Sequence, residues 1–185
     1  MGDVTRYLCV PLTVSIFFAG GCSSATSLLS SLSSSIQVIM AGSYETPDGA
    51  AGNADPKFVA FTLNSVVLKS ADGDLAVFDG EPTEFRIISR DSLIAEKDLT
   101  DQEGLAYTGA EVTFAADVTM GGKYADDLTA TLAAPTATLT ESLAIETAKT
   151  IKLFVKAKWR NTVTRDDDAE TETAVAPSLS VSRSN

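Results

Sequence analysis

Two stretches of this chain alternate between apolar and polar side chains, and this pattern constrains the fold more tightly than any other feature of the sequence. In the first, the apolar positions are 112, 114, 116, 118 and 120, and in the second they are 151, 153, 155, 157 and 159. Successive side chains of a β-strand point to opposite faces, so a period of two predicts a strand with one buried side. We therefore predict two strands that contribute these core residues: Val112, Phe114, Val118, Leu153, Val155 and Trp159.

Shorter apolar runs predict further strands at 36–40, 59–68, 75–78, 85–87 and 178–181. The apolar parity changes within 59–68, which predicts a β-bulge near Asn64 and Ser65. Pro135 is expected to split the threonine-rich run that surrounds it. Residues 92–104 have the weakest strand pattern, and we predict one or two helical turns there.

Together these patterns predict an all-β fold, an antiparallel β-sandwich of about seven to nine strands of the prealbumin or immunoglobulin type.

Composition argues against several classes of function. The 185 residues include 25 acidic and 14 basic side chains, a formal charge of −11. This balance argues against nucleic acid as a partner, because phosphate binding needs a basic surface. The chain contains no histidine, so it lacks the residues for Ser-His-Asp or Cys-His catalysis and for imidazole-based zinc sites. We therefore expect no enzyme activity, no cofactor and no metal site.

Calcium is the metal that the residue types leave open, because its preferred ligands are oxygen atoms. The segment around Asp72 lacks the twelve-residue loop and the terminal glutamate of an EF-hand. Asp and Gly are also the residues that hairpin turns favour. We expect turns rather than calcium ligands at the candidate positions, which are Asp72, Asp74, Asp126, Asp127 and the run 166–168.

The first 21 residues have the features of a secretory signal. Positions 8–21 carry no charge and follow Arg6, and these fourteen residues are too few for a membrane-spanning helix, which needs about 20. The run ends in Ala-Gly-Gly followed by Cys22. This ending resembles the lipobox of bacterial lipoproteins, in which small residues precede a cysteine that is lipidated and becomes the new N-terminus. The resemblance implies a lipoprotein signal peptide at 1–21 and an acylated Cys22. The alternative is an ordinary secretory signal with a chance cysteine.

Residues 22–35 are predicted to be a lipidated, serine-rich tether, because eight of the thirteen residues from Ser23 to Ser35 are serine. In enterobacterial lipoproteins an Asp after the lipidated cysteine tends to retain the protein at the inner membrane. Ser23 at this position therefore implies an outer-membrane destination, on the periplasmic face or the cell surface. We divide the rest of the chain into a β-sandwich domain at 36–163 and an acidic C-terminal segment at 164–185, which is expected to contain a last strand.

The order of features in the sandwich resembles that of the uncharacterised prealbumin-like (transthyretin-like) domains of bacterial lipoproteins. The segments that carry this resemblance are FTLNSVVLKSADGD, TEFRIISRDSLIAEKDL and LAYTGAEVTFAADVTM. In that family a glycine is expected just before the tyrosine of the central strand. In this chain Gly104 lies three residues before Tyr107, so the glycine is displaced. The family has no established active site, so the resemblance implies a fold and no functional residues.

Basic residues are concentrated in one part of the chain. The segment 149–165 contains six of the thirteen basic residues that follow Cys22 and no acidic residue. A period of two places four of them on the exposed face of one strand, and we call these four the basic stripe: Lys152, Lys156, Lys158 and Arg160. The stripe either binds an anionic partner such as lipopolysaccharide or an acidic polymer, or pairs with carboxylates such as Glu111 and Asp117. The acidic composition favours pairing.

These features predict a non-catalytic lipoprotein of the cell envelope with a binding, adhesion or structural role. Its contact with the membrane is the lipid on Cys22, and its expected partner is an envelope polysaccharide or a protein. Two alternatives stay open. One is a subunit of a surface assembly that joins by strand pairing. The other is a carbohydrate-active or calcium-dependent protein, for which paired carboxylates in a pocket are expected.

Overall fold

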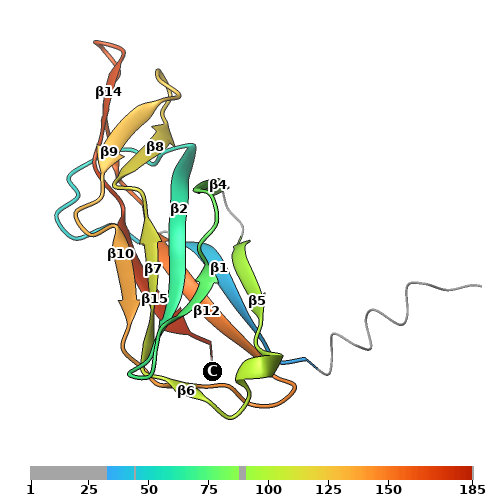
Figure 1. Cartoon of the computed structure of the whole chain (residues 1–185). Coiled ribbons are helices and arrows are strands. Elements are labelled where there is room, and N and C mark those ends of the chain that lie inside the picture. The colour runs from blue at the N-terminus through green and yellow to red at the C-terminus, as the bar shows by residue number, and fades with distance from the viewer. Residues whose placement is uncertain (1–32, 44, 88–90, 185) are drawn as a thin grey trace, which may run out of the picture.

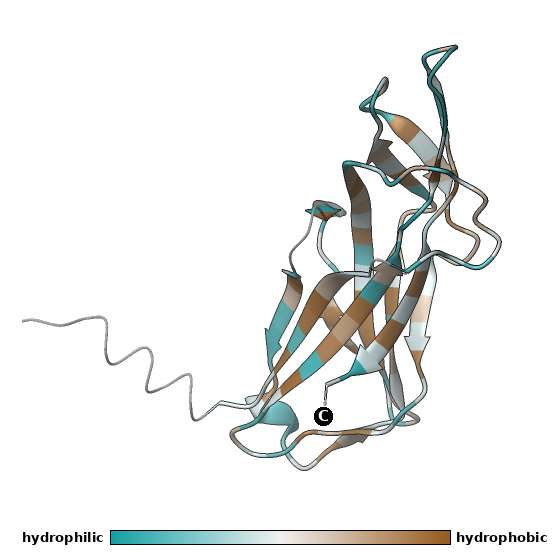
Figure 2. Cartoon of the chain, turned by 180° about the vertical axis from the view of Figure 1, so that it is seen from behind, coloured by the Kyte–Doolittle hydropathy of each residue, from teal (hydrophilic) through white to brown (hydrophobic). Residues whose placement is uncertain are grey.

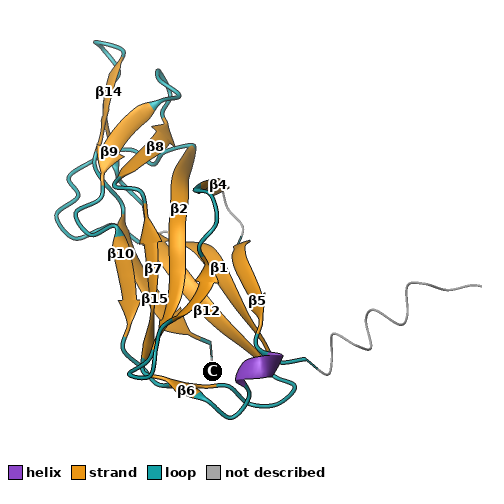
Figure 3. Cartoon of the chain, in the orientation of Figure 1, coloured by secondary structure: helices purple, strands orange, loops and turns teal. Residues whose placement is uncertain are grey.

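The computed structural model describes residues 33–43, 45–87 and 91–184. The predicted signal peptide, Cys22 and most of the tether lie outside these residues. Within the described residues the fold is all-β, as predicted, and consists of two main sheets and two short strand pairs. Helical structure in this part of the chain is limited to one 3-10 turn, η1 (Thr100–Gln102), as Figure 3 shows.

One main sheet has four strands in the order β15-β12-β1-β5. β1 pairs with β12 in parallel and with β5 in antiparallel orientation, and β12 pairs antiparallel with β15. The sheet takes its edge strand β15 from the segment that we set apart at 164–185. The bounds of the four strands are Ser178–Arg183 for β15, Thr150–Lys158 for β12, Ser35–Ser43 for β1 and Ser92–Asp98 for β5.

The other main sheet is built around β2 (Phe58–Lys69). Each edge of β2 pairs with a row of two strands that lie end to end. A third row of two strands lies end to end in the same way and pairs with the outer side of the first row. These rows consist of β7 (Gly109–Phe114) with β8 (Asp117–Gly121), β3 (Leu75–Phe78) with β4 (Thr83–Ile87), and β10 (Thr136–Leu139) with β9 (Leu128–Thr131). The seven strands therefore form four antiparallel rows, which Figure 1 shows packed against the four-stranded sheet.

The interruptions within these rows follow from local sequence. The run 112–120, which we predicted as one strand, is divided at Ala115, whose N–H still donates to Thr62 O (2.8 Å) and keeps the two parts in line. Pro135 separates β9 from β10, as predicted, because proline cannot donate a hydrogen bond to the sheet. The register of β2 against β7 shifts between Leu63 and Ser65, which confirms the predicted bulge.

The structure of residues 92–104 differs from the predicted helical turns. Most of them form β5 rather than helical turns, and η1 is a single turn after it. A register shift between Val38 and Ile39 of β1 lets β5 bury two consecutive residues, Ile94 and Ala95. This bulge hides the period of two on which a strand prediction depends.

Two short strand pairs lie at opposite ends of the sandwich (Figure 1). β6 (Ala106–Tyr107) pairs with β11 (Leu143–Ala144) at the end near η1, and β13 (Val163–Asp166) pairs with β14 (Thr171–Ala174) at the other end. We did not predict the second pair, because its acidic and threonine-rich residues lack an apolar alternation.

The core lies between the two main sheets. The six residues predicted to be buried, from Val112 to Trp159, are each at most 6% exposed, which confirms that prediction. Phe61 and Phe114 meet edge to face, with 5.7 Å between their ring centroids. Figure 2 shows apolar and polar residues alternating along the strands, as a two-sided sheet requires.

Candidate functional site

The outer face of the four-stranded sheet brings together most of the residues that the sequence singles out. We use this name for the side chains of its strands that point away from the core. The strand registers arrange these side chains in rows that cross the sheet from β15 to β5. Three successive rows contain Lys152, Gln37 and Glu96, then Ser182, Phe154, Ile39 and Leu93, then Ser180, Lys156 and Ala41.

Three residues of the basic stripe lie on this face. Lys152, Lys156 and Lys158 alternate along β12 with buried residues, as predicted. Arg160 lies beyond the end of β12, where the chain turns after Trp159, and its backbone N–H donates to Glu45 O (3.2 Å). Arg160 therefore does not continue the row of lysines along the strand.

The three lysines differ in their partners. Lys158 Nζ lies 2.9 Å from Glu45 Oε2, and this hydrogen bond raises the pKa of Lys158 and lowers the pKa of Glu45. Lys156 contributes to the lowered pKa of Glu45 at longer range. Neither Lys152 nor Lys156 forms an ion pair with a described residue. The middle of the outer face thus carries two lysines without a bound counter-charge in the described structure.

The carboxylates that we expected beside the stripe lie elsewhere, so pairing with them is wrong. Glu111 and Asp117 belong to β7 and β8 of the other main sheet. Glu111 lies 3.7 Å from Lys69 Nζ, and Asp117 accepts a hydrogen bond from Thr131 (2.7 Å). A period of two predicts which residues share a face of a strand, but it does not predict which strands lie beside it.

An apolar row crosses the middle of the outer face. Ile39 of β1 lies between Phe154 of β12 and Leu93 of β5, and Leu93 is 50% exposed. Lys152 and Lys156 stand two positions before and after Phe154. The face therefore combines cationic groups with apolar surface, which suits a partner that is anionic and in part apolar.

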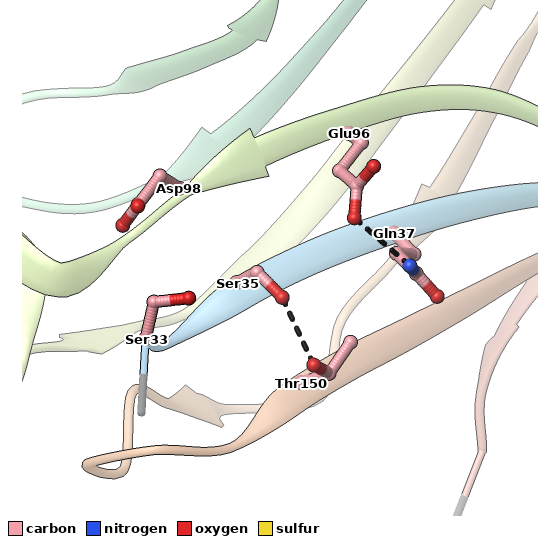
Figure 4. Close-up of a pocket in the computed structure, with 6 residues that line it drawn as sticks. All are labelled: Ser33, Ser35, Gln37, Glu96, Asp98 and Thr150. Atoms are coloured by element: carbon pink, nitrogen blue, oxygen red, sulfur yellow. Dashed lines mark hydrogen bonds between the residues drawn. The ribbon is translucent and has the colours of Figure 1, made fainter. Parts of the chain in front are cut away.

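A polar pocket opens at the end of the outer face where the described chain begins (Figure 4). Its volume is about 420 Å³, and it is lined by Ser33, Ser35, Gln37, Glu96, Asp98 and Thr150. Ser35 and Thr150 share a hydrogen bond of 2.9 Å, and Gln37 donates one of 2.9 Å to Glu96. The pocket presents hydroxyl, amide and carboxylate groups, so its chemistry suits a polar, hydroxyl-bearing ligand.

The aspartates considered as calcium ligands make other interactions. Asp74 pairs with Lys69 and accepts the Ser70 N–H (3.1 Å), and these contacts lower the pKa of Asp74. Asp126 lies 3.3 Å from Lys57 Nζ. Among the residues that the structure describes, no group of three or more histidine, cysteine, aspartate or glutamate side chains is placed to hold a metal ion.

The most strongly perturbed carboxylate, Glu172, lies on β14 at the opposite end of the sandwich, and we did not single it out from the sequence. Its side chain is fully buried. It accepts hydrogen bonds from the backbone N–H groups of Lys123 (2.9 Å), Tyr124 (2.8 Å) and Ala125 (3.3 Å) and from Arg165 Nε (2.7 Å). Burial opposes ionisation, but these donors outweigh it and lower the pKa of Glu172 to about 2. We call this arrangement the Glu172 clasp, because it fastens the hairpin β13–β14 to the loop after β8.

Comparisons of the chain with protein-family models, with curated proteins and with solved structures found no match. In the described part of the chain no helix has the length and apolar character needed to cross a membrane. The lipobox and the likeness to prealbumin-like lipoprotein domains stay predictions. The outer face is the candidate site that follows from the geometry of the described residues.

Proposed function

We propose that this chain is a lipid-anchored protein of the bacterial cell envelope that binds an anionic partner through the outer face of its β-sandwich. Its role is one of binding, adhesion or structure and involves no catalysis. The anchor is the lipid on Cys22 and the destination is the outer membrane. The partner is a negatively charged envelope polymer or protein.

The N-terminal sequence supports the anchor. An uncharged run ends at small residues before Cys22, and a serine-rich segment leads from there to β1. Ser33, at the start of the described chain, lines the polar pocket on the outer face. The eleven residues 23–33 span at most about 40 Å when extended. The tether therefore joins the domain beside the outer face and keeps this face within reach of partners near the membrane.

The observation that carries the binding proposal is the pair Lys152 and Lys156. Both side chains are exposed on a central strand, in a chain with 25 acidic residues, and neither forms an ion pair with a described residue. Because these two lysines form no ion pair with a described residue, they lack even the roughly 0 to 1 kcal/mol that an exposed ion pair contributes to stability. An anionic partner would supply the missing counter-charge.

Retention of the chain on immobilised lipopolysaccharide tests this proposal. We expect retention at low salt that weakens as salt is added, because the screening length falls to about 10 Å at 0.1 M. The double variant K152Q/K156Q is expected to lose most of the retention. K57Q is the control, because Lys57 is exposed, immediately precedes β2 of the other main sheet and pairs with Asp126. Retention that is insensitive to salt, or an equal loss in both variants, contradicts the proposal.

Assembly by strand pairing is a second candidate, and one observation favours it. β15 is an edge strand that pairs with β12, and no backbone hydrogen bond to another described strand occupies its other side. A free sheet edge is a place where an extended segment of another chain can add by main-chain hydrogen bonds.

A further inference from the structure

β15 has a row of backbone groups that lack hydrogen-bond partners in the described structure. In an antiparallel pair, alternate residues direct their N–H and C=O groups to the neighbouring strand. Ser184 N–H donates to Lys152 O (3.0 Å), so the serines of β15 are the residues that bond to β12. Leu179, Val181 and Arg183 consequently direct their N–H and C=O groups away from β12. Among the described strands β15 pairs with β12 alone, and no described loop residue forms a backbone hydrogen bond with these groups.

This edge has few of the features that protect other edge strands from pairing, because β15 contains no proline and no bulge and its one charged residue is Arg183 at its end. β5, at the opposite edge, has a register shift and three consecutive charged residues, Glu96 to Asp98. β15 keeps an unbroken register with β12 and has no charged residue before Arg183. β10 of the other sheet begins beside β15, but the two strands separate towards Arg183 (Figure 1, Figure 2). The end of β15 towards Arg183 is therefore the more open part of this edge.

The side chains beside the edge favour a particular kind of strand. The β15 residues on the outer face are serines, whose side chains are short. A strand added to β15 lies about 10 Å from β12, because neighbouring strands are about 4.8 Å apart. The long side chains of Lys152 and Lys156 can reach across the serines towards this position. They would attract carboxylates that occupy alternate positions of the added strand.

We propose that the anionic partner binds as an extended polypeptide segment that adds to the free edge of β15. Val181 and Arg183 supply main-chain hydrogen bonds, and Lys152 and Lys156 select Asp or Glu at alternate positions of the segment. This inference rests on the proposed function and names its partner as an acidic polypeptide strand rather than a polysaccharide.

Titration of the full chain, in detergent solution, with a capped eight-residue peptide of alternating Thr and Glu tests the inference. Amide NMR signals of Val181 and Arg183 are expected to shift, and their hydrogen exchange is expected to slow, because the peptide covers these groups. A peptide of alternating Thr and Lys is the matched probe and is expected to bind about tenfold more weakly or worse. Equal binding of the two peptides overturns the inference.

Variants separate the backbone contribution from the charge contribution. V181P removes an N–H that points away from β12, and proline is tolerated on edge strands. We expect V181P to lose about tenfold or more in affinity for the Thr-Glu peptide. V181A retains the N–H and is expected to bind like the wild type. K152Q/K156Q is expected to bind several-fold more weakly, with a reduced dependence on salt. Unchanged binding by V181P overturns the proposal.

The remaining outcomes are also decisive. If V181P does not fold, hydrogen exchange of the wild-type chain is the test. Unchanged exchange at the Val181 and Arg183 amides with the Thr-Glu peptide present overturns the inference. If lipopolysaccharide retention depends on Lys152 and Lys156 but the peptide does not bind, the proposed function stands and this inference fails. If the chain dimerises without peptide and V181P abolishes the dimer, the occupant of the edge is a second copy and the inference is wrong.

Discussion

Glu172 joins two segments that lie far apart in the sequence. Its carboxylate takes the place of water at three backbone N–H groups and at Arg165. A Cβ atom at Gly122 would overlap Glu172 Oε2, so the loop needs glycine there for the carboxylate to approach its backbone. No periodicity marks such a contact, because it depends on where the hairpin β13–β14 lies after folding. This is why the sequence did not predict the clasp.

E172A is expected to lower the free energy of unfolding at pH 7 by about 3 kcal/mol, because it removes a buried carboxylate that accepts hydrogen bonds from three backbone N–H groups and from Arg165. Urea unfolding of the variant and the wild type measures this difference. The control is E141A, which changes a glutamate that is exposed and is expected to alter stability little. Equal effects of the two substitutions contradict the structural role of the clasp.

The stabilisation by Glu172 is expected to depend on pH in a direction set by its lowered pKa. The contribution is fully present above the ordinary glutamate pKa of about 4.3. It is lost as the pH falls towards about 2, where the folded-state carboxylate becomes protonated. The difference in unfolding free energy between wild type and E172A should therefore shrink from pH 7 to pH 3. A difference that grows in acid is inconsistent with an ionised, hydrogen-bonded Glu172.

Gly122 and Glu172 are expected to be coupled. G122A should destabilise the wild type, because its Cβ displaces the carboxylate. The same change should cost less in the E172A background, where no carboxylate occupies that space and the close contact left is with Ala125 O at 3.0 Å. A double-mutant cycle measures the coupling, and additive effects of the two substitutions contradict the close contact.

For the strands, the sequence correctly predicted which side chains share one face of a strand, but it did not predict which strands lie side by side. The alternation along β12 placed Leu153 inside and three lysines outside, and both placements are confirmed. β5 was missed because a bulge interrupts its alternation. The parallel pairing of β1 with β12 joins segments more than a hundred residues apart, and no local pattern encodes it. For this reason the lysines of the candidate site were predictable as a group, whereas their partners Glu111 and Asp117 were predicted wrongly.

Two phenylalanines, one that faces the core and one on the outer face, allow the same substitution to be compared at both positions. Phe114 is 2% exposed and packs edge to face against Phe61, whereas Phe154 lies on the outer face. F114A is expected to lower the unfolding free energy by about 3 to 5 kcal/mol, since it leaves a cavity in the core. F154A makes the same chemical change and is expected to cost about 1 kcal/mol or less. Similar losses in urea unfolding would show that the two faces are assigned incorrectly.

The polar pocket, the lysines of the outer face and the Glu172 clasp lie at different positions along the length of the molecule. The described chain begins beside the polar pocket, the lysines follow along the outer face, and the Glu172 clasp closes the opposite end (Figure 1). This order suits a domain that is tethered at one end and meets a partner along one sheet. The sequence predicted a tether up to residue 35 and the sandwich after it, but Ser35 already belongs to β1 and Ser34 is buried, so the sandwich begins before residue 36.

The proposed lipid anchor on Cys22 can be tested on the whole chain in a bacterial host that carries out lipoprotein processing. Intact mass and N-terminal analysis of the membrane fraction should show a chain that begins at an acylated Cys22. C22S should lack the lipid, because serine does not supply the thiol that accepts it. An unmodified Cys22, or residues 1–21 still attached in the wild-type protein, contradicts lipid anchoring.

Mapping the contact surface of an anionic probe tests whether the outer face is the binding site. A short sulfated oligosaccharide is titrated into the isotope-labelled chain at low salt, and the amide NMR shifts are followed. The largest shifts are expected at Lys152, Lys156 and their neighbours on β1 and β15, and they are expected to largely disappear in K152Q/K156Q. Shifts centred on the Glu172 clasp, or shifts on the outer face that persist unchanged in the double variant, would contradict this expectation.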